Sequence, residues 1–357
     1  MLEIISNNQR KYFGLQEVDP SWKEIKVESE NFNGFEVVIY VDNNIVKKCI
    51  ICGEKKYKEM QMDIELTNKL DEIVATGNSK KNSSLDSIIN KTGAGVTISF
   101  DAPNITIYSE TTKKFFYTNF FERKDELKTV NDFKTWAENW CNESTESDIA
   151  EATAFALDTT KEHVKFNEGD VFRVKLTRKI YGYGRVLVNY IKMRNNHEDF
   201  WDILMGTPVV ASLYHILTED KNVKVDDLKN LKSFPSQIIL DNNIYYGDYK
   251  IIGNIPVDFE NDDFPIMYGK ELTGNNTHFQ RGKAHLVLEN TMPLYNNFKF
   301  NGVSLNIGCD YEIMKECVET GSNAPYYEKG PFFVRGDLRN PKNAEALDAI
   351  LKQFNLK

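Results

Sequence analysis

Apolar and polar residues alternate along much of the first 120 positions, and this period of two predicts β-strands. The expected strands lie at residues 25–27, 35–39, 45–51, 55–66, 96–100, 105–108 and 115–121. Before them, Ser6 and Gln9 have the spacing of a capping box, which predicts a short helix that ends near Gly14. Asn131 is expected to cap a helix that carries Phe133, Trp136 and Trp140.

A polar, acidic stretch at residues 142–151 (NESTESDIAE) interrupts this pattern and marks a domain boundary. We expect an N-terminal β-rich domain over 1–145, a helical connector over 146–165 and a second domain over 166–357. In the second domain, the pattern predicts strands at residues 169–176, 181–188, 208–217, 249–256, 284–288 and 303–307, and helices at 225–231, 311–318 and after Asn340-Pro341. The predicted fold class is therefore α+β: two β-rich domains of mostly antiparallel sheets flanked by short helices.

The composition narrows the class of protein. A net charge of -9 disfavours nucleic acid as a direct ligand, because phosphate binding needs a clustered basic surface. The sequence contains no apolar run of about 18 residues and no apparent signal peptide, so we expect no membrane contact and a cytoplasmic location. Five scattered cysteines do not form a disulfide framework, and Cys49 and Cys52 fall in a β-branched run typical of a strand.

Motifs for catalysis are missing from the sequence, which contains no GxSxG, P-loop or HExxH pattern. We therefore predict no catalytic residue, no metal ligand and no cofactor. A metal-dependent hydrolase would require histidines to converge with carboxylates in a pocket. The histidines available for such a site are His197, His215, His278 and His285.

An acidic cluster follows the strand predicted at 249–256, and it has two interpretations. Its carboxylates are Asp258, Glu260, Asp262 and Asp263. The cluster is either a solvated loop or a negative patch that faces a basic partner, such as a nuclease. Arg185 and Trp201 are of the types that often anchor interfaces, although Arg185 could equally pair with Asp170 and Trp201 could lie in the core.

The segment from Gly169 to Leu187, GDVFRVKLTRKIYGYGRVL, resembles the immunity protein 26 family of bacterial polymorphic toxin systems. The residues that carry the resemblance are Gly169, Asp170, Phe172, Tyr181, Gly182, Tyr183, Gly184 and Arg185. Later matches are residues 205–210 (MGTPVV), 249–256 (YKIIGNIP), Phe264-Pro265 and 335–341 (RGDLRNP). The motif is a signature of fold rather than of catalysis.

The resemblance implies an antitoxin, which binds a cognate toxin protein and blocks its active or substrate-binding surface. Asp258, Glu260, Asp262, Asp263 and Trp201 are the candidate toxin-binding residues. The family name is also linked to a phosphotriesterase, so an esterase or phosphotriesterase is the alternative function. The third possible function is that of a scaffold protein, which would have neither a binding patch nor a catalytic site. The oligomeric state is left open.

Overall fold

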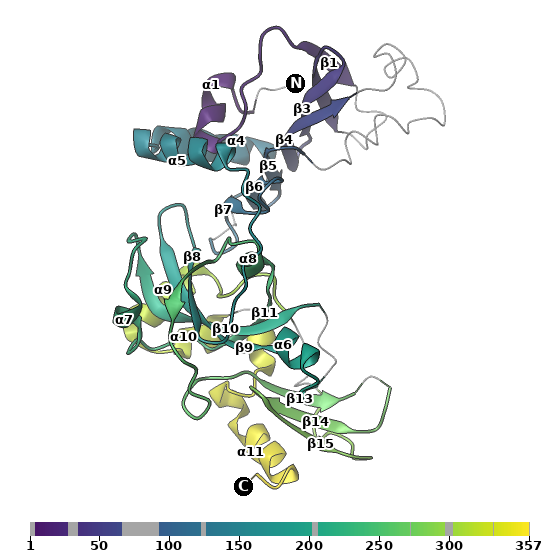
Figure 1. Ribbon diagram of the computed structural model, residues 1–357, viewed down its shortest axis with the longest axis vertical. Coiled ribbons are helices and arrows are strands. Elements are labelled where there is room, and N and C mark those ends of the chain that lie inside the picture. Colours follow the sequence, from purple (N-terminus) through teal and green to yellow (C-terminus); the bar gives the residue numbers. More distant parts are fainter. Residues whose placement is uncertain are drawn as a thin grey trace. The chain divides into compact units, whose positions relative to one another are not determined.

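The computed structural model describes residues 4–27, 35–65, 93–122, 126–201, 206–271, 273–296, 303–330 and 332–356. They form two compact units, Met1–Glu162 and His163–Lys357 (Figure 1). Three mostly antiparallel sheets and several short helices confirm the predicted α+β class. The boundaries predicted at 145 and 165 stay a prediction. Among the residues described, no helix is long and apolar enough to cross a membrane.

The first unit is built on a seven-stranded antiparallel meander in which each strand pairs with the next along the chain. Its strands are β1 (Lys23–Val27), β2 (Glu36–Asp42), β3 (Ile45–Cys52), β4 (Lys56–Glu65), β5 (Val96–Asp101), β6 (Asn104–Ser109) and β7 (Phe115–Thr118). All seven overlap the strands expected from the alternating pattern. The chain turns at residues 43–44 between β2 and β3, and β5 and β6 form a hairpin around Pro103. A predicted loop at 77–84 and a predicted helix at 84–90 lie outside the described residues.

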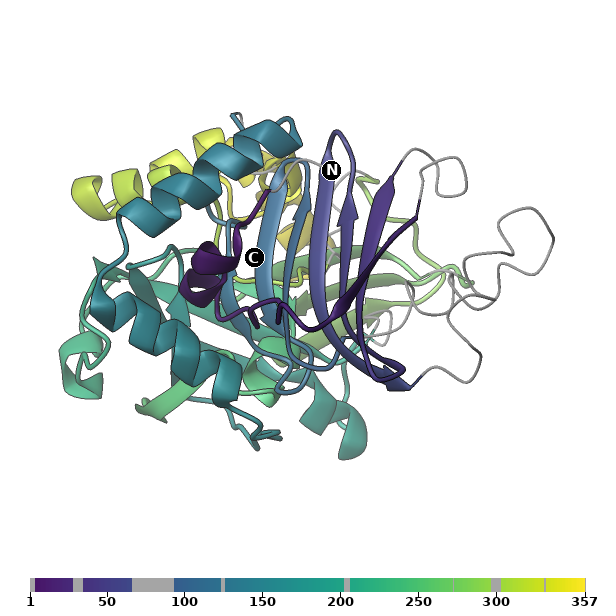
Figure 2. The same cartoon turned by 90° about the horizontal axis from the view of Figure 1, so that it is seen from above.

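Two helices, α4 (Val130–Asn142) and α5 (Glu146–Leu157), pack on one face of this sheet (Figure 2). Thr129, rather than Asn131, caps α4, because its hydroxyl accepts a hydrogen bond from the Asp132 amide. The capping box at Ser6 is confirmed and begins α1 (Asn7–Arg10), which continues into η1 (Lys11–Phe13). Gly14 ends this turn at a φ of 66°, where a Cβ would lie 2.7 Å from the Ala152 carbonyl oxygen of α5.

The cysteine pair at positions 49 and 52 lies on β3, as the β-branched run predicted. Both thiols are free, and Cys49 is fully buried in an apolar cluster with Val37, Met60 and Met62. Burial raises the pKa of the Cys49 thiol to about 12. Cys49 is therefore a core residue, whereas Cys52 is partly buried and packs against a different apolar cluster.

The second unit contains a five-stranded antiparallel sheet in the order β11-β10-β9-β8-β12. Its strands are β8 (Asp170–Lys175), β9 (Tyr181–Asn189), β10 (Pro208–Thr218), β11 (Gln237–Leu240) and β12 (Lys250–Asn254). A separate three-stranded sheet contains β13 (Ile266–Lys270), β14 (Thr277–Arg281) and β15 (Ala284–Leu288). The strand predicted at 303–307 is wrong, because Ser304 forms only an isolated parallel bridge to Ile239.

Short helices connect and cover these sheets. They are α6 (Tyr190–Asn195), α7 (Val225–Leu228), α8 (Asn242–Tyr245), α9 (Tyr311–Thr320), α10 (Ala324–Lys329), η3 (Phe332–Gly336), η4 (Pro341–Asn343) and α11 (Ala344–Gln353). As predicted, Asn340 caps the final turn before Pro341, and α11 follows. The apolar side of α11 packs on the three-stranded sheet through Ile350 and Phe354.

Candidate functional site

The signature hairpin β8–β9 lies inside the five-stranded sheet, and every residue of β9 is buried. Its glycines are required by close packing. A Cβ on Gly184 would lie 2.5 Å from the Ser212 carbonyl oxygen of β10 and 2.6 Å from the Phe172 ring of β8. A Cβ on Gly182 would lie 2.9 Å from Leu176. The glycine pattern therefore lets large side chains of β8 lie across β9, which is a structural role.

Arg185 follows these glycines and holds the acidic loop after β12. Its side chain is only 9% exposed. One Nη donates to the Pro256 carbonyl oxygen at 3.0 Å, and the other donates to the Asp262 carboxylate. The expected alternative partner, Asp170, accepts instead from the Asn167 amide and the Asn254 side chain. The signature arginine thus fixes a loop 77 positions away in sequence.

The acidic loop is folded on its own carboxylates. Asp262 accepts a hydrogen bond from the Asp258 amide at 2.8 Å. Asp258 accepts from the Asn261 side chain at 2.7 Å and from the Glu260 amide at 3.0 Å. The Asn261 side chain and the Glu260 amide lower the pKa of Asp258. Asp263 points elsewhere, since it accepts from the Ser236 amide and from Arg339.

The exposed part of this loop combines charge with an aromatic ring. Asp258, Phe259 and Glu260 are exposed, and the Phe259 side chain is 47% accessible. Its ring stacks on Phe264 with centroids 5.6 Å apart, and the Lys283 ammonium lies 5.1 Å from its centroid. The exposed Phe259 ring is therefore held in place between two exposed carboxylates, Asp258 and Glu260.

The other candidate residues of the second unit have structural surroundings. Trp201 is 3% exposed and stacks on His278 at 5.0 Å, so it lies in the core and is not part of the surface proposed below. Tyr181 and Tyr183 are buried together with Tyr214 and Leu228. The Tyr183 hydroxyl donates to the Asp220 carbonyl oxygen at 2.6 Å.

Two of the four candidate histidines converge with carboxylates. His278 on β14 and His285 on β15 lie diagonally across a hairpin, with ring nitrogens 3.0 Å apart. The other ring nitrogen of His285 lies 3.0 Å from an Asp199 oxygen, and Nε2 of His278 lies 3.6 Å from a Glu271 oxygen. Desolvation, together with the neighbouring imidazole, lowers the pKa of His278.

The other two candidate histidines lie apart from the His278–His285 pair. His197 is exposed in a left-handed turn, and His215 bonds to Asn323 at 2.8 Å. Within the described ranges, no hydroxyl or thiol is bonded to His278 or His285, and no group of three or more potential ligands is arranged to hold a metal ion. Asp199, His285 and His278 form a connected series of polar contacts, and in the described part of the chain no hydroxyl or thiol joins it as a nucleophile.

These features define a β-sheet module in which a signature arginine fixes an exposed acidic and aromatic loop. Residues 167–278 match the family model described as Immunity protein 26, and this segment is similar to that family. The match begins just before β8 and ends at the second residue of β14, so it includes both Arg185 and the acidic loop. No curated protein and no solved structure matches the chain.

Proposed function

We propose that this protein is an immunity protein that binds a cognate toxin in the cytoplasm and blocks the toxin's active or substrate-binding surface. The observation that carries the proposal is the match of residues 167–278 to the immunity protein 26 family. The proposed role is inhibition by binding and not catalysis.

The proposed contact surface is the exposed part of the acidic loop: Asp258, Phe259 and Glu260. Two carboxylates suit a basic toxin, and a nuclease carries such a surface to hold its own substrate. Phe259 supplies apolar area at low entropic cost, because its ring is already fixed by Phe264 and Lys283. Asp262 and Asp263 support the loop from behind through Arg185 and Arg339.

The primary test is co-expression with toxins encoded beside the gene. We expect growth to be rescued and the two proteins to co-purify as a stable complex. The proposal fails if none of the neighbouring toxins is neutralised and none binds the purified protein.

A second test addresses the surface. Glu260→Lys leaves the pairs of Asp262 with Arg185 and of Asp263 with Arg339 intact. It should slow association with a basic toxin about two- to fivefold at low salt. High salt should remove most of this difference. Phe259→Ala should weaken the complex by about tenfold, mainly through faster dissociation.

Glu319→Lys is the matched control, because Glu319 is an exposed carboxylate on α9 with the same change of net charge. Stopped-flow or surface-plasmon kinetics compare the three variants. If Glu260→Lys and Phe259→Ala behave like Glu319→Lys, the acidic loop is not the contact surface, while the immunity function itself depends on the rescue experiment.

A further inference from the structure

A cavity of about 390 Å³ lies in the first unit, outside the segment that matches the immunity family. Its walls come from the N-terminal segment, which crosses the sheet face, and from β1 to β4. The apolar wall includes Ile4, Ile5, Val38 and Ile50. The volume falls within the range of small-molecule sites.

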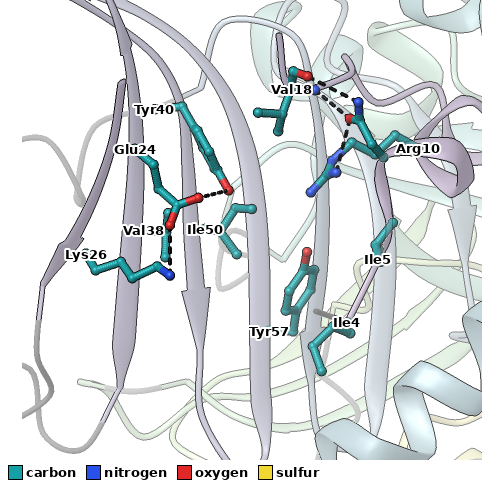
Figure 3. A pocket seen from close by; sticks show the side chains of 11 residues that line it. Ile4, Ile5, Arg10, Val18, Glu24, Lys26, Val38, Tyr40, Ile50 and Tyr57 are labelled. Atoms are coloured by element: carbon teal, nitrogen blue, oxygen red, sulfur yellow. Dashed lines mark hydrogen bonds and ion pairs between the residues drawn. The ribbon is translucent and has the colours of Figure 1, made fainter. Parts of the chain in front are cut away.

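Six polar side chains line this cavity, and three of them come from separate elements on different sides of it (Figure 3). Arg10 approaches from α1, Tyr40 from β2 and Tyr57 from β4. The Tyr40 hydroxyl donates to Glu24 at 3.2 Å, and desolvation and Glu24 raise the pKa of Tyr40 to about 12. Tyr40 is therefore a neutral hydrogen-bonding group at physiological pH.

The charge beneath the cavity is unbalanced. Arg10 and Lys48 both pair with the same carboxylate, Glu59, and all three side chains are at most 5% exposed. Glu59 is saturated, because it also accepts from the Tyr57 hydroxyl at 2.7 Å. At the rim, Lys26 and Glu24 pair with each other at 2.9 Å and cancel. With Lys48 protonated, the set holds one more cation than it has carboxylates. This arrangement is costly in a low-dielectric interior, and burial lowers the pKa of Lys48 accordingly.

Arg10 also has N–H groups that bond to none of the described residues. Its Nε and one Nη donate to Glu59, and the other Nη donates to Asn7 at 3.3 Å. A guanidinium has five N–H groups, so these three bonds leave two without a partner among the described residues. Arg10 lines the cavity, where an anion could accept both donors.

We infer that this cavity binds a small amphipathic carboxylate. Its anionic head accepts hydrogen bonds from Arg10 and neutralises the excess charge of the Arg10–Lys48–Glu59 cluster. Its apolar body lies along Val38, Ile50 and Ile4. This inference does not depend on toxin binding, because every residue that carries it lies in the first unit.

The experiment is a titration of the full-length protein with n-octanoate, in which calorimetry and NMR measure binding. We expect a dissociation constant between about 10 µM and 1 mM, as the efficiency of small ligands suggests. Three matched probes test the two parts of the ligand. Octan-1-ol lacks the negative head, and n-octylammonium carries a positive head instead. Inorganic phosphate is an anion that lacks the apolar body. Each should bind at least about tenfold more weakly than octanoate.

Two variants locate the site. Arg10→Gln leaves Lys48 and Glu59 as a balanced pair and should weaken octanoate binding by about tenfold. Lys48→Met removes the excess cation, leaves the cavity lining intact and should weaken binding by about threefold. Lys47→Met is the control, because Lys47 is the neighbouring residue on β3 and pairs with Asp63 at 3.0 Å instead. It should bind as the wild type does.

The inference is overturned if octanoate does not bind, if n-octylammonium or phosphate binds as tightly, or if neither Arg10→Gln nor Lys48→Met weakens octanoate binding. Circular dichroism of each variant establishes that it is folded. If Arg10→Gln does not fold, Lys48→Met against Lys47→Met decides the result.

Discussion

Each unit buries an arginine in a charged cluster. The ratio of cations to carboxylates differs between the two clusters, with carboxylates in excess in one and cations in the other. In the second unit, Arg339 faces two carboxylates, Asp337 and Asp263. In the first unit, Arg10 and Lys48 share the single carboxylate of Glu59. The second cluster is thus rich in carboxylates, and the first is rich in cations.

The donors of the two arginines show the same contrast. Arg339 uses all five N–H groups, because it bonds twice to Asp337, once to Asp263 and twice to Ser236. Asp337 and Asp263 outweigh burial and raise the pKa of Arg339, so it stays charged. Arg10 uses three of its donors. A saturated buried ion cluster serves the fold, whereas an unsaturated one beside a cavity is suited to a ligand.

The largest expected effect comes from removing the shared carboxylate of the first cluster. Glu59→Gln leaves Arg10 and Lys48 buried without a counter-charge, so the first unit should lose about 4 kcal/mol of unfolding free energy. Asp337→Asn is the matched change in the second unit. It should cost about 2 kcal/mol, because Arg339 keeps Asp263 and both contacts with Ser236.

Unfolding in urea is monitored by hydrogen–deuterium exchange, which gives the unfolding free energy of each unit from its own peptides. Lys48→Met serves as the reciprocal control, since it removes the excess cation and should cost less than Glu59→Gln. Equal losses for Glu59→Gln and Asp337→Asn would contradict the view that the two clusters differ in charge balance.

Local patterns predicted most of the fold. The alternation over β2 to β7 and the capping box at Ser6 depend on residues close in sequence, and the structure confirms both. The strand predicted at 303–307 failed because a short apolar run also suits an irregular segment that packs on a sheet edge. The β13–β14 hairpin was missed, and its strands are mostly buried, which hides the alternating pattern.

The sites were less predictable, because they depend on distant pairs. The sequence indicated Arg185 and the acidic loop separately, but it could not join residues 77 positions apart. The pairing of Arg10 with Glu59, 49 positions away, gave no local signal at all. The sequence named His278 and His285 as two of four candidate histidines and gave no sign that these two lie together. The contact across the hairpin came only from the strand register.

A smaller effect is expected on the pH dependence of the unfolding free energy, to which histidines contribute. All five histidines lie in the second unit. Desolvation lowers the pKa of both His278 and His215 in the folded protein. Below about pH 6.5, the unfolded chain therefore binds protons that the folded unit does not, and stability falls as the pH falls. Each histidine can contribute at most about 1.4 kcal/mol per pH unit.

Acidification from pH 7 to 6 should therefore lower the unfolding free energy of the second unit and leave that of the first nearly unchanged. His278→Gln should remove part of the slope, because the variant lacks one of the two histidines whose pKa is lowered on folding. His197→Gln is the control, since His197 is exposed and should not alter the slope. An equal response in both units would show that groups other than the buried histidines govern this pH dependence.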